Sequence, residues 1–130
     1  MILNKKNIRV IVVEPPNQHP VHEKARPNGS LGPAYIVGAL RQHGIEADYL
    51  DATVGLNGSD LSETFYNRNE MENGNIRCGM KEKVLPEIFS QYDIVATSSI
   101  FTVQTRMHFE IAAIAKKVQK ENGKQILTIS

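Results

Sequence analysis

The residues best suited to chemistry lie in one loop near the start of the chain. His19 and His22 are three positions apart. Glu14 and Glu23 stand close to them in the sequence. Imidazole and carboxylate groups are ligands of zinc and related metals, so this set could serve a small metal-dependent enzyme. Histidines in loops are more often solvated, however, and the sequence shows no second ligand pair. We therefore predict no metal ligand and keep the metal site as an alternative.

The single cysteine, Cys78, is the other group with intrinsic reactivity. One cysteine cannot form a disulfide within the chain or supply a multi-cysteine zinc or iron–sulfur site. A catalytic thiol needs a neighbour that stabilises the thiolate, and no histidine follows Cys78 closely in the sequence. The pattern favours an unreactive thiol, and we predict no catalytic residue in this chain.

A buried strand positions the loop that carries the two histidines. Residues 8–13 are almost entirely Ile and Val, and Pro15 and Pro16 follow directly after Glu14. A short β-branched run bounded by turn residues predicts a strand buried on both faces of a parallel sheet. Proline lacks the N–H that a sheet needs, so the prolines end the strand and residues 17–33 form a loop. Ligands of open α/β sheets bind outside the carboxyl ends of the strands, so this loop is expected to hold the ligand.

The next element is a helix predicted over residues 33–44, with Gly44 as its C-terminal stop. Ile36, Val37 and Leu40 are expected to share its buried face. Gly38 weakens a helix, and we expect it to permit close packing of this helix on the sheet. A strand over residues 46–51 follows, which completes a β-α-β unit with a right-handed crossover.

Residues 53–80 are the least regular part of the chain, rich in Asn and Gly and poor in large apolar residues. A capping pattern that begins at Asp60 predicts a short helix over residues 60–72. Connections of this length are usually functional or mobile. The sequence leaves open whether the segment is a lid or an inserted excursion.

The second half of the chain repeats the helix–strand alternation. We predict helices over residues 81–91 and 103–122, and strands over residues 92–99 and 124–130. Pro86 predicts either a kink in the first of these helices or a start one turn later. Thr102 is the expected N-cap of the second, whose apolar residues recur every three or four positions: Val103, Met107, Ile111, Ile114 and Val118.

This alternation predicts an α/β fold. We expect an open, doubly wound, mainly parallel sheet of flavodoxin-like or Rossmann-like type, with strand order 2-1-3-4. The 130 residues fit a single domain, residues 1–130. The sequence ends on its last predicted strand, so we expect the sheet to be incomplete at the C-terminus and the chain to be the N-terminal part of a longer protein.

Composition narrows the range of partners. The net charge is +1 and the 15 basic residues are scattered, which argues against nucleic acid. No apolar run reaches the length of a membrane span, and no signal peptide is evident, so we predict a cytoplasmic protein. The glycine motifs of dinucleotide-binding and P-loop proteins are missing after the first strand. The acidic residues of a response-regulator receiver are also missing, since the third strand ends in Thr97, Ser98 and Ser99.

Several short segments, in the right order, resemble one protein family. Residues 31–41 read LGPAYIVGALR and follow the strand that ends in Pro-Pro. Residues 49–52 read YLDA and residues 93–99 read DIVATSS. The next helix carries small residues and a lysine at Ala112, Ala113, Ala115 and Lys116. These segments are similar to the amino-terminal cobalamin-binding domain of cobalamin-dependent radical SAM enzymes, whose first loop ends in a Pro-Leu-Gly-Leu-x-Tyr-Leu-Ala-type turn into a helix.

The resemblance implies that the chain binds cobalamin at the carboxyl edge of its sheet. The cofactor-binding residues that it implies are Pro16, Leu31, Gly32, Tyr35, Ser98, Ser99 and Thr102. Small hydroxyl residues at a strand end leave space and offer hydrogen bonds, and glycine permits close backbone approach. The family continues with a Gly-Gly loop after its fourth strand. This chain ends one step before that loop, so the resemblance implies a truncated member.

Two family motifs are missing. Without D-x-H-x-x-G, the resemblance implies cobalamin held with no protein histidine on its cobalt. Without C-x-x-x-C-x-x-C, this chain cannot perform radical chemistry itself. S-adenosylmethionine and a 4Fe-4S cluster would be bound by a downstream radical SAM domain of the same protein, an enzyme of methyltransferase or cyclase type. The alternative is a non-catalytic flavodoxin-like interaction or regulatory module without a cofactor.

Overall fold

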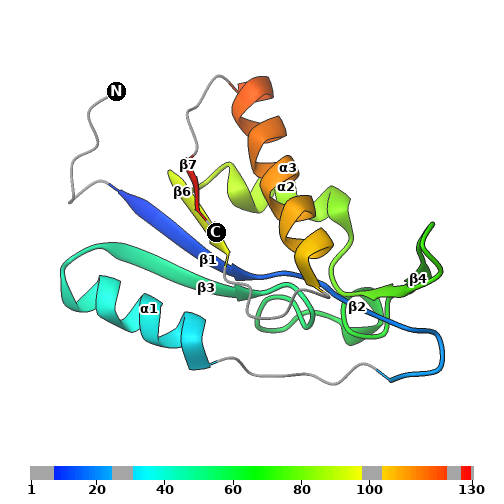
Figure 1. Cartoon of the computed structure of the whole chain (residues 1–130). Coiled ribbons are helices and arrows are strands. Elements are labelled where there is room, and N and C mark those ends of the chain that lie inside the picture. The colour runs from blue at the N-terminus through cyan, green and yellow to red at the C-terminus, as the bar shows by residue number, and fades with distance from the viewer. Residues whose placement is uncertain (1–7, 25–30, 98–103, 123–126, 130) are drawn as a thin grey trace.

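The computed structural model of the chain describes residues 8–24, 31–97, 104–122 and 127–129 (Figure 1). A parallel sheet of four strands lies at its centre, in the order β3-β1-β6-β7. Its strands are β1 (Arg9–Glu14), β3 (Glu46–Asp51), β6 (Ile94–Thr97) and β7 (Leu127–Ile129). This is the order predicted from the sequence. The fold is therefore α/β with a parallel sheet, and β1 occupies an internal position.

Helices cover both faces of this sheet (Figure 1). Helix α1 (Leu31–Gln42) lies on one face, and α2 (Leu85–Phe89) and α3 (Thr105–Asn122) lie on the other. The side chains of β1 alternate between the two cores. Val10 and Val12 pack in the core beneath α1, whereas Ile11 and Val13 pack in the core shared with α2 and α3. The prediction that this strand is buried on both faces is confirmed.

Helix α1 begins at Leu31 and ends at Gln42, two residues earlier at each end than predicted. Gly44 follows with a φ of +78°, the left-handed conformation that commonly closes a helix. Val37 is buried and Leu40 is half-buried, as expected. Ile36 is 44% exposed, so its predicted place on the buried face is wrong. The helix therefore contacts the sheet through a narrow stripe and leaves much of its surface open.

Gly38 lies on the open side of α1, and the expected close packing at this residue is wrong. A Cβ added there meets no atom within 4 Å. Alanine should therefore fit without strain, and it is favoured over glycine in a helix interior by about 1 kcal/mol. Gly38→Ala is expected to raise the free energy of unfolding by about this amount.

Urea denaturation would measure the effect of Gly38→Ala as a higher midpoint at unchanged slope. Gly44→Ala is the matched control, because its surroundings are equally open but its φ of +78° disfavours any L side chain. The control should be destabilised. A Gly38→Ala variant no more stable than the original chain would contradict the prediction.

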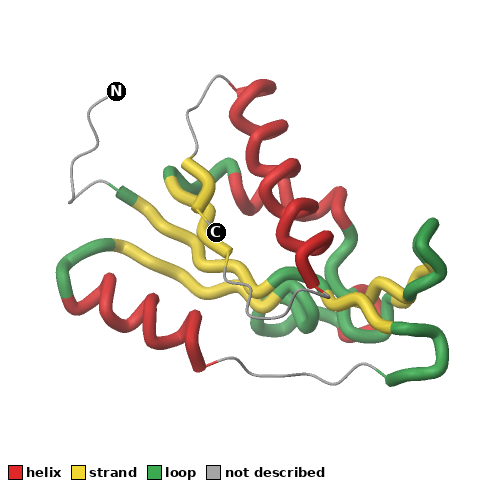
Figure 2. The backbone as a smooth tube through the Cα atoms, viewed as in Figure 1, coloured by secondary structure: helices red, strands yellow, loops and turns green. Residues whose placement is uncertain are grey.

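A second sheet, antiparallel and three-stranded, lies beyond the carboxyl ends of the first (Figure 2). Its order is β2-β5-β4, formed by β2 (Asn17–His19), β5 (Ile76–Cys78) and β4 (Arg68–Glu70). This sheet was not predicted from the sequence. Residues 17–19 were expected to be loop, but they pair with β5 instead. A three-residue strand carries too little pattern to be recognised before its partner is known.

The predicted helix over residues 60–72 is also wrong. Asp60 does cap a helical turn, because its side chain accepts a hydrogen bond from the Ser62 amide at 2.9 Å. That turn is only η1 (Leu61–Glu63), a 3-10 helix of three residues, and β4 follows it. The segment has too few apolar residues to bury one face of a longer helix.

The elements of the second half agree better with prediction. A 3-10 turn, η2 (Glu82–Val84), precedes α2, and Pro86 lies in the first turn of α2. Of the two alternatives for Pro86, the later start is correct. In α3, Met107, Ile111, Ile114 and Val118 are buried as predicted. Val103, the Thr102 cap, Ser98 and Ser99 lie outside the described residues. None of the described helices combines the length and apolar composition that crossing a membrane requires.

Candidate functional site

Three strands of the parallel sheet end side by side, at Glu14, Asp51 and Thr97. Helix α1 runs antiparallel to them and starts toward the same edge, so its first turn faces the carboxyl ends of the strands (Figure 1). The antiparallel sheet lies on the far side of this edge (Figure 2). Open α/β sheets bind their ligands at this edge, so a ligand site is expected here.

Two carboxylates face each other across this edge. Glu14 ends β1 and Asp51 ends β3, and the two residues are paired in register. Both are partly buried. Burial raises the pKa of the Glu14 carboxyl, and the charge of Asp51 raises it further. Burial also raises the pKa of Asp51, against hydrogen bonds from Thr53 and Val54 that lower it. The pair therefore takes up protons more readily than exposed acids do.

The two carboxylates differ in how they are held. Asp51 Oδ1 accepts a hydrogen bond from the Thr53 amide at 2.9 Å, and the Thr53 hydroxyl donates to the Pro15 carbonyl at 3.3 Å. The Ala52 amide donates to the Glu14 carbonyl at 2.8 Å. These bonds fix the turn after β3 against the end of β1. For the Glu14 carboxylate, by contrast, no hydrogen bond with another described residue is found, and the side chain is partly buried.

The predicted cofactor-binding residues fall into three groups. Leu31, Gly32 and Tyr35 all lie exposed in the first turns of α1, and Leu31 and Tyr35 are 73% and 75% exposed. Residues four apart on a helix share a face, so the structure brings these two apolar side chains together. Pro16, in contrast, is fully buried. Ser98, Ser99 and Thr102 lie outside the described residues.

Pro16 forms the joint between the two sheets. A Cβ added at Gly79 would lie 2.8 Å from Pro16 Cβ and 2.7 Å from the Ala52 carbonyl oxygen. The backbone that follows β5 therefore passes very close to the ends of β1 and β3. The Met80 amide donates to the same Ala52 carbonyl at 2.7 Å. Pro16 therefore shapes the edge from within the protein.

The alternative metal site is not assembled. His19 is buried, and its Nδ1 lies 2.8 Å from the Pro20 carbonyl while its Nε2 lies 3.3 Å from an Arg68 guanidinium nitrogen. Both ring nitrogens thus have protein partners. His22 is exposed. Within the described ranges, no three His, Cys, Asp or Glu side chains gather closely enough to hold a metal ion.

Cys78 is fully buried in β5, and burial raises the pKa of its thiol. The nearby charges of Arg68 and Arg77 act in the opposite direction, but burial is the larger influence. A thiol in this setting is neutral and shielded, in keeping with the unreactive role that the sequence favours.

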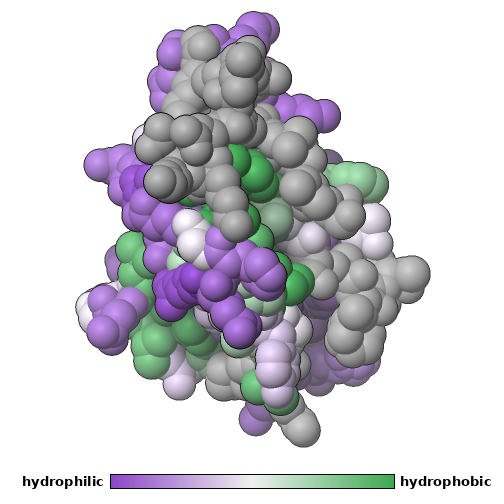
Figure 3. Space-filling view, turned by 90° about the vertical axis from the view of Figure 1, so that its left-hand side faces the viewer, coloured by the Kyte–Doolittle hydropathy of each residue, from purple (hydrophilic) through white to green (hydrophobic). Residues whose placement is uncertain are grey.

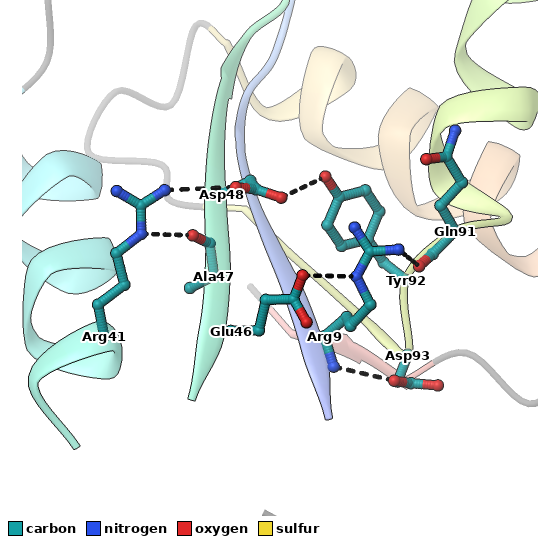
Figure 4. Close-up of polar contacts among 8 residues, drawn as sticks. All are labelled: Arg9, Arg41, Glu46, Ala47, Asp48, Gln91, Tyr92 and Asp93. Atoms are coloured by element: carbon teal, nitrogen blue, oxygen red, sulfur yellow. Dashed lines mark hydrogen bonds and ion pairs between the residues drawn. The ribbon is translucent and has the colours of Figure 1, made fainter. Parts of the chain in front are cut away.

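A second group of charged residues lies at the opposite edge, where the strands begin. Figure 3 shows this end of the molecule, with hydrophilic residues across the middle and hydrophobic residues beside them. Asp48 accepts hydrogen bonds from the Tyr92 hydroxyl at 2.6 Å and from Arg41 at 3.3 Å (Figure 4). The Arg9 guanidinium contacts Glu46 and the Gln91 carbonyl, and stacks 4.9 Å from the centre of the Tyr92 ring.

These groups satisfy one another, and each bond joins two elements of the fold. The Arg41 Nε donates to the Ala47 carbonyl at 2.7 Å, which covers part of the free edge of β3 (Figure 4). Burial, followed by the hydrogen bond to Asp48, raises the pKa of Tyr92 to about 12, so its hydroxyl stays a donor. We interpret this cluster as structural.

The residues that the structure makes most distinctive are not those that the sequence pattern singles out. Glu14 was considered only as a metal ligand, and Asp51 only as part of a family motif. Their signal was present, because both end adjacent parallel strands and such ends meet at one edge. Arg77 and Glu110 form a largely buried ion pair that no sequence pattern indicated, since they come from two elements far apart in the chain.

Comparisons of the chain with protein-family models, with curated proteins and with solved structures found no match.

Proposed function

We propose that this chain is the cobalamin-binding domain of a cytoplasmic radical SAM enzyme of methyltransferase or cyclase type, with a flavodoxin-like fold. The observation that carries the proposal is the surface at the carboxyl edge of the sheet. There the exposed side chains of Leu31 and Tyr35 lie on the first turns of α1, at the edge where β1 and β3 end in Glu14 and Asp51.

This surface suits the chemistry of a corrin. The macrocycle is broad, flat and largely apolar, and an exposed tyrosine ring and leucine side chain offer it apolar contact. Its rim carries amides, which need hydrogen-bond acceptors when they leave water. The carboxylates of Glu14 and Asp51 are acceptors of that kind, and Gly32 leaves the backbone accessible.

The residues of this chain would bind and orient the cofactor, and the cobalt chemistry would belong to the cofactor itself. In the same proposal, S-adenosylmethionine and the 4Fe-4S cluster are bound by a downstream radical SAM domain.

A second candidate function has an observation in its favour. Strand β2 follows Pro16 directly, and Gln18 and His19 are buried there. The start of the predicted ligand loop is thus used for packing within the protein. A flavodoxin-like interaction or regulatory module without cofactor would use its loop in this way.

Titration of the chain with hydroxocobalamin, followed by visible absorption, separates the two functions. Binding is expected to change the spectrum and to saturate. Tyr35→Ala removes an exposed aromatic contact from the proposed surface, worth about 1 kcal/mol, and is expected to weaken binding by roughly fivefold to tenfold.

The matched control is Phe109→Ala. Phe109 is 68% exposed, like Tyr35, but lies on α3, which covers the opposite face of the sheet. The control should bind as the original chain does. No spectral change at high micromolar cofactor would overturn the cobalamin proposal and leave the interaction module. Equal losses of cobalamin affinity in the two variants would show that the surface on α1 is not the cobalamin-binding site.

A further inference from the structure

The antiparallel sheet has two outer strands, β2 and β4, and their edges differ. At β2, the Gln104 side chain accepts a hydrogen bond from the Gln18 amide at 3.1 Å and donates one to the Gln18 carbonyl at 2.9 Å. Uncovered strand edges carry free N–H and C=O groups that can pair with another chain. The contact with Gln104 therefore closes the middle of the β2 edge to such pairing.

The edge of β4 is open in the part of the chain that the structure describes. Its three residues are all exposed: Arg68, Asn69 and Glu70. The strand lies at one end of the molecule, beyond the carboxyl ends of the parallel strands (Figure 1). Strand β5 pairs with its inner side, and no hydrogen bond from a described side chain to the backbone of Arg68 or Glu70 is found. The outer side of β4 is thus available to a further strand.

The outward backbone groups of β4 belong to Arg68 and Glu70. Successive residues of a strand direct their N–H and C=O groups to opposite sides. The Met71 amide donates to the Asn75 carbonyl at 2.8 Å, so Met71 faces inward, toward the chain that forms β5. Asn69, two positions earlier, faces inward as well. The residues on either side of Asn69 therefore present an amide and a carbonyl each to the open edge.

We propose that β4 pairs antiparallel with β4 of a second copy of this chain, which joins the two three-stranded sheets into one continuous sheet. The two-fold axis passes between the two Asn69 residues. Arg68 of each copy then lies opposite Glu70 of the other, and each such pair exchanges two backbone hydrogen bonds. The interface is isologous, because both copies use the same strand. It is separate from the cobalamin surface on α1 and does not depend on the proposed function.

The charges of β4 make the strand complementary to itself. Arg68 and Glu70 are two positions apart, so their side chains share one face of the sheet. In the antiparallel pair, a positive side chain lies opposite a negative one at both positions, which stabilises a sheet, whereas like charges would destabilise it. Edge strands that resist association often carry lysines. An edge with charges of one sign would repel its own copy, but this edge does not.

The Arg68 guanidinium is held on this face by a contact within the chain. Its Nη2 lies 3.3 Å from His19 Nε2, and His19 Nδ1 lies 2.8 Å from the Pro20 carbonyl oxygen. Arginine can only donate, so Nε2 accepts from Arg68 and Nδ1 donates to Pro20. The guanidinium keeps further N–H groups for a carboxylate. Glu70 has no ion-pair partner within the described ranges, so its carboxylate can accept from Arg68 of the second copy.

Sedimentation velocity of the whole chain over a range of concentrations tests the proposal. The dimer fraction is expected to rise with concentration, because a contact through one short strand gives a weak dimer. A chain that is still monomeric at about 1 mM would overturn the proposal.

Glu70→Arg tests the charge pairing. It places two arginines opposite each other at both positions, so the dissociation constant of the dimer should rise roughly tenfold or more. Adding Arg68→Glu restores opposite charges and should recover most of the lost affinity. Glu87→Arg is the matched control, because it makes the same charge change at an exposed residue of α2 and should leave the dissociation constant unchanged. A dissociation constant that Glu70→Arg changes no more than the control does, or that the double variant does not recover, refutes the pairing.

Glu70→Pro tests the backbone hydrogen bonds, with Glu70→Gln as the control for the lost charge. Proline removes an amide that faces away from β5, so the variant should keep the Tm of the original chain. It should lose dimerisation, whereas Glu70→Gln should retain a weakened dimer. Asn69→Pro removes an inward donor and should lower Tm instead. A Glu70→Pro chain that dimerises as well as Glu70→Gln would overturn the proposal.

Discussion

Replacing Gly79 with alanine is expected to lower the free energy of unfolding by roughly 3 kcal/mol or more. Gly79 has a φ of +138°, which L side chains rarely adopt. A Cβ at this position would lie 2.7 Å from the Ala52 carbonyl oxygen and 2.8 Å from Pro16 Cβ. Neither neighbour can move easily, because one is backbone at the end of β3 and the other is a buried proline after β1.

The loss should spread beyond the immediate clash. The Gly79 carbonyl accepts a hydrogen bond from Asn67 at 3.0 Å, and the next amide, that of Met80, donates to Ala52 at 2.7 Å. Any shift that makes room for a methyl group strains both bonds. The position is the point at which residues 53–80 return to the parallel sheet, so the antiparallel sheet should be loosened as a whole.

Thermal and urea denaturation of Gly79→Ala would measure this cost, which corresponds to a fall in Tm of roughly 10 °C for a domain of this size. Gly58→Ala is the matched control. Its φ of +85° is also positive, but its Cβ would meet no atom within 4 Å, so it shows the backbone cost alone. Equal losses of unfolding free energy in the two variants would mean that Pro16 and Ala52 shift at little cost, and that the contact between the two sheets is easily deformed.

The parallel sheet could be predicted because its strands and helices carry their patterns locally. The β-branched run of β1 and the apolar repeat of α3 are each sufficient to identify the element, and their alternation predicts a parallel sheet, of which the order 2-1-3-4 is one common form. The antiparallel sheet could not be predicted in this way. Strands β2, β4 and β5 have three residues each, and they exist because they pair with segments far away in the sequence.

The residues of the candidate site likewise fall into some that could be predicted and some that could not. Leu31 and Tyr35 could be named because the family resemblance covers the segment that leads into α1. The exposure of Ile36 and the open space at Gly38 could not be predicted, because the apolar sequence of α1 does not show how much of the helix surface the sheet covers. Pro16 was expected at the ligand, but its burial depends on Gly79, more than 60 positions later in the chain.

Replacing Arg77 with methionine should be the other strongly destabilising change, with an expected loss of roughly 3 kcal/mol or more of the free energy of unfolding at neutral pH. Arg77 is buried and makes three hydrogen bonds, two to Glu110 and one to the Met80 carbonyl. Without it, the Glu110 carboxylate, whose side chain is only 12% exposed, loses its ion-pair partner. An unpaired buried carboxylate is costly, and the Met80 carbonyl loses its donor too.

A double-mutant cycle shows whether the pairing itself accounts for this loss. Glu110→Leu removes the carboxylate, so combining it with Arg77→Met replaces a buried ion pair by apolar side chains of similar size. Such replacements are often close to neutral, so the double variant should recover most of the stability that Arg77→Met loses. Strictly additive losses in urea denaturation would contradict this interpretation.

Arg77→Lys separates charge from geometry in the same ion pair. Lysine keeps the positive charge but lacks the planar fork that reaches both oxygens of Glu110 and the Met80 carbonyl together. An intermediate loss, of about 1 to 2 kcal/mol, is expected. A lysine variant as stable as the original chain would show that charge alone holds β5 against α3. A loss as large as that of Arg77→Met would show that the bidentate hydrogen bonds carry the contact, and that the antiparallel sheet is positioned by their geometry.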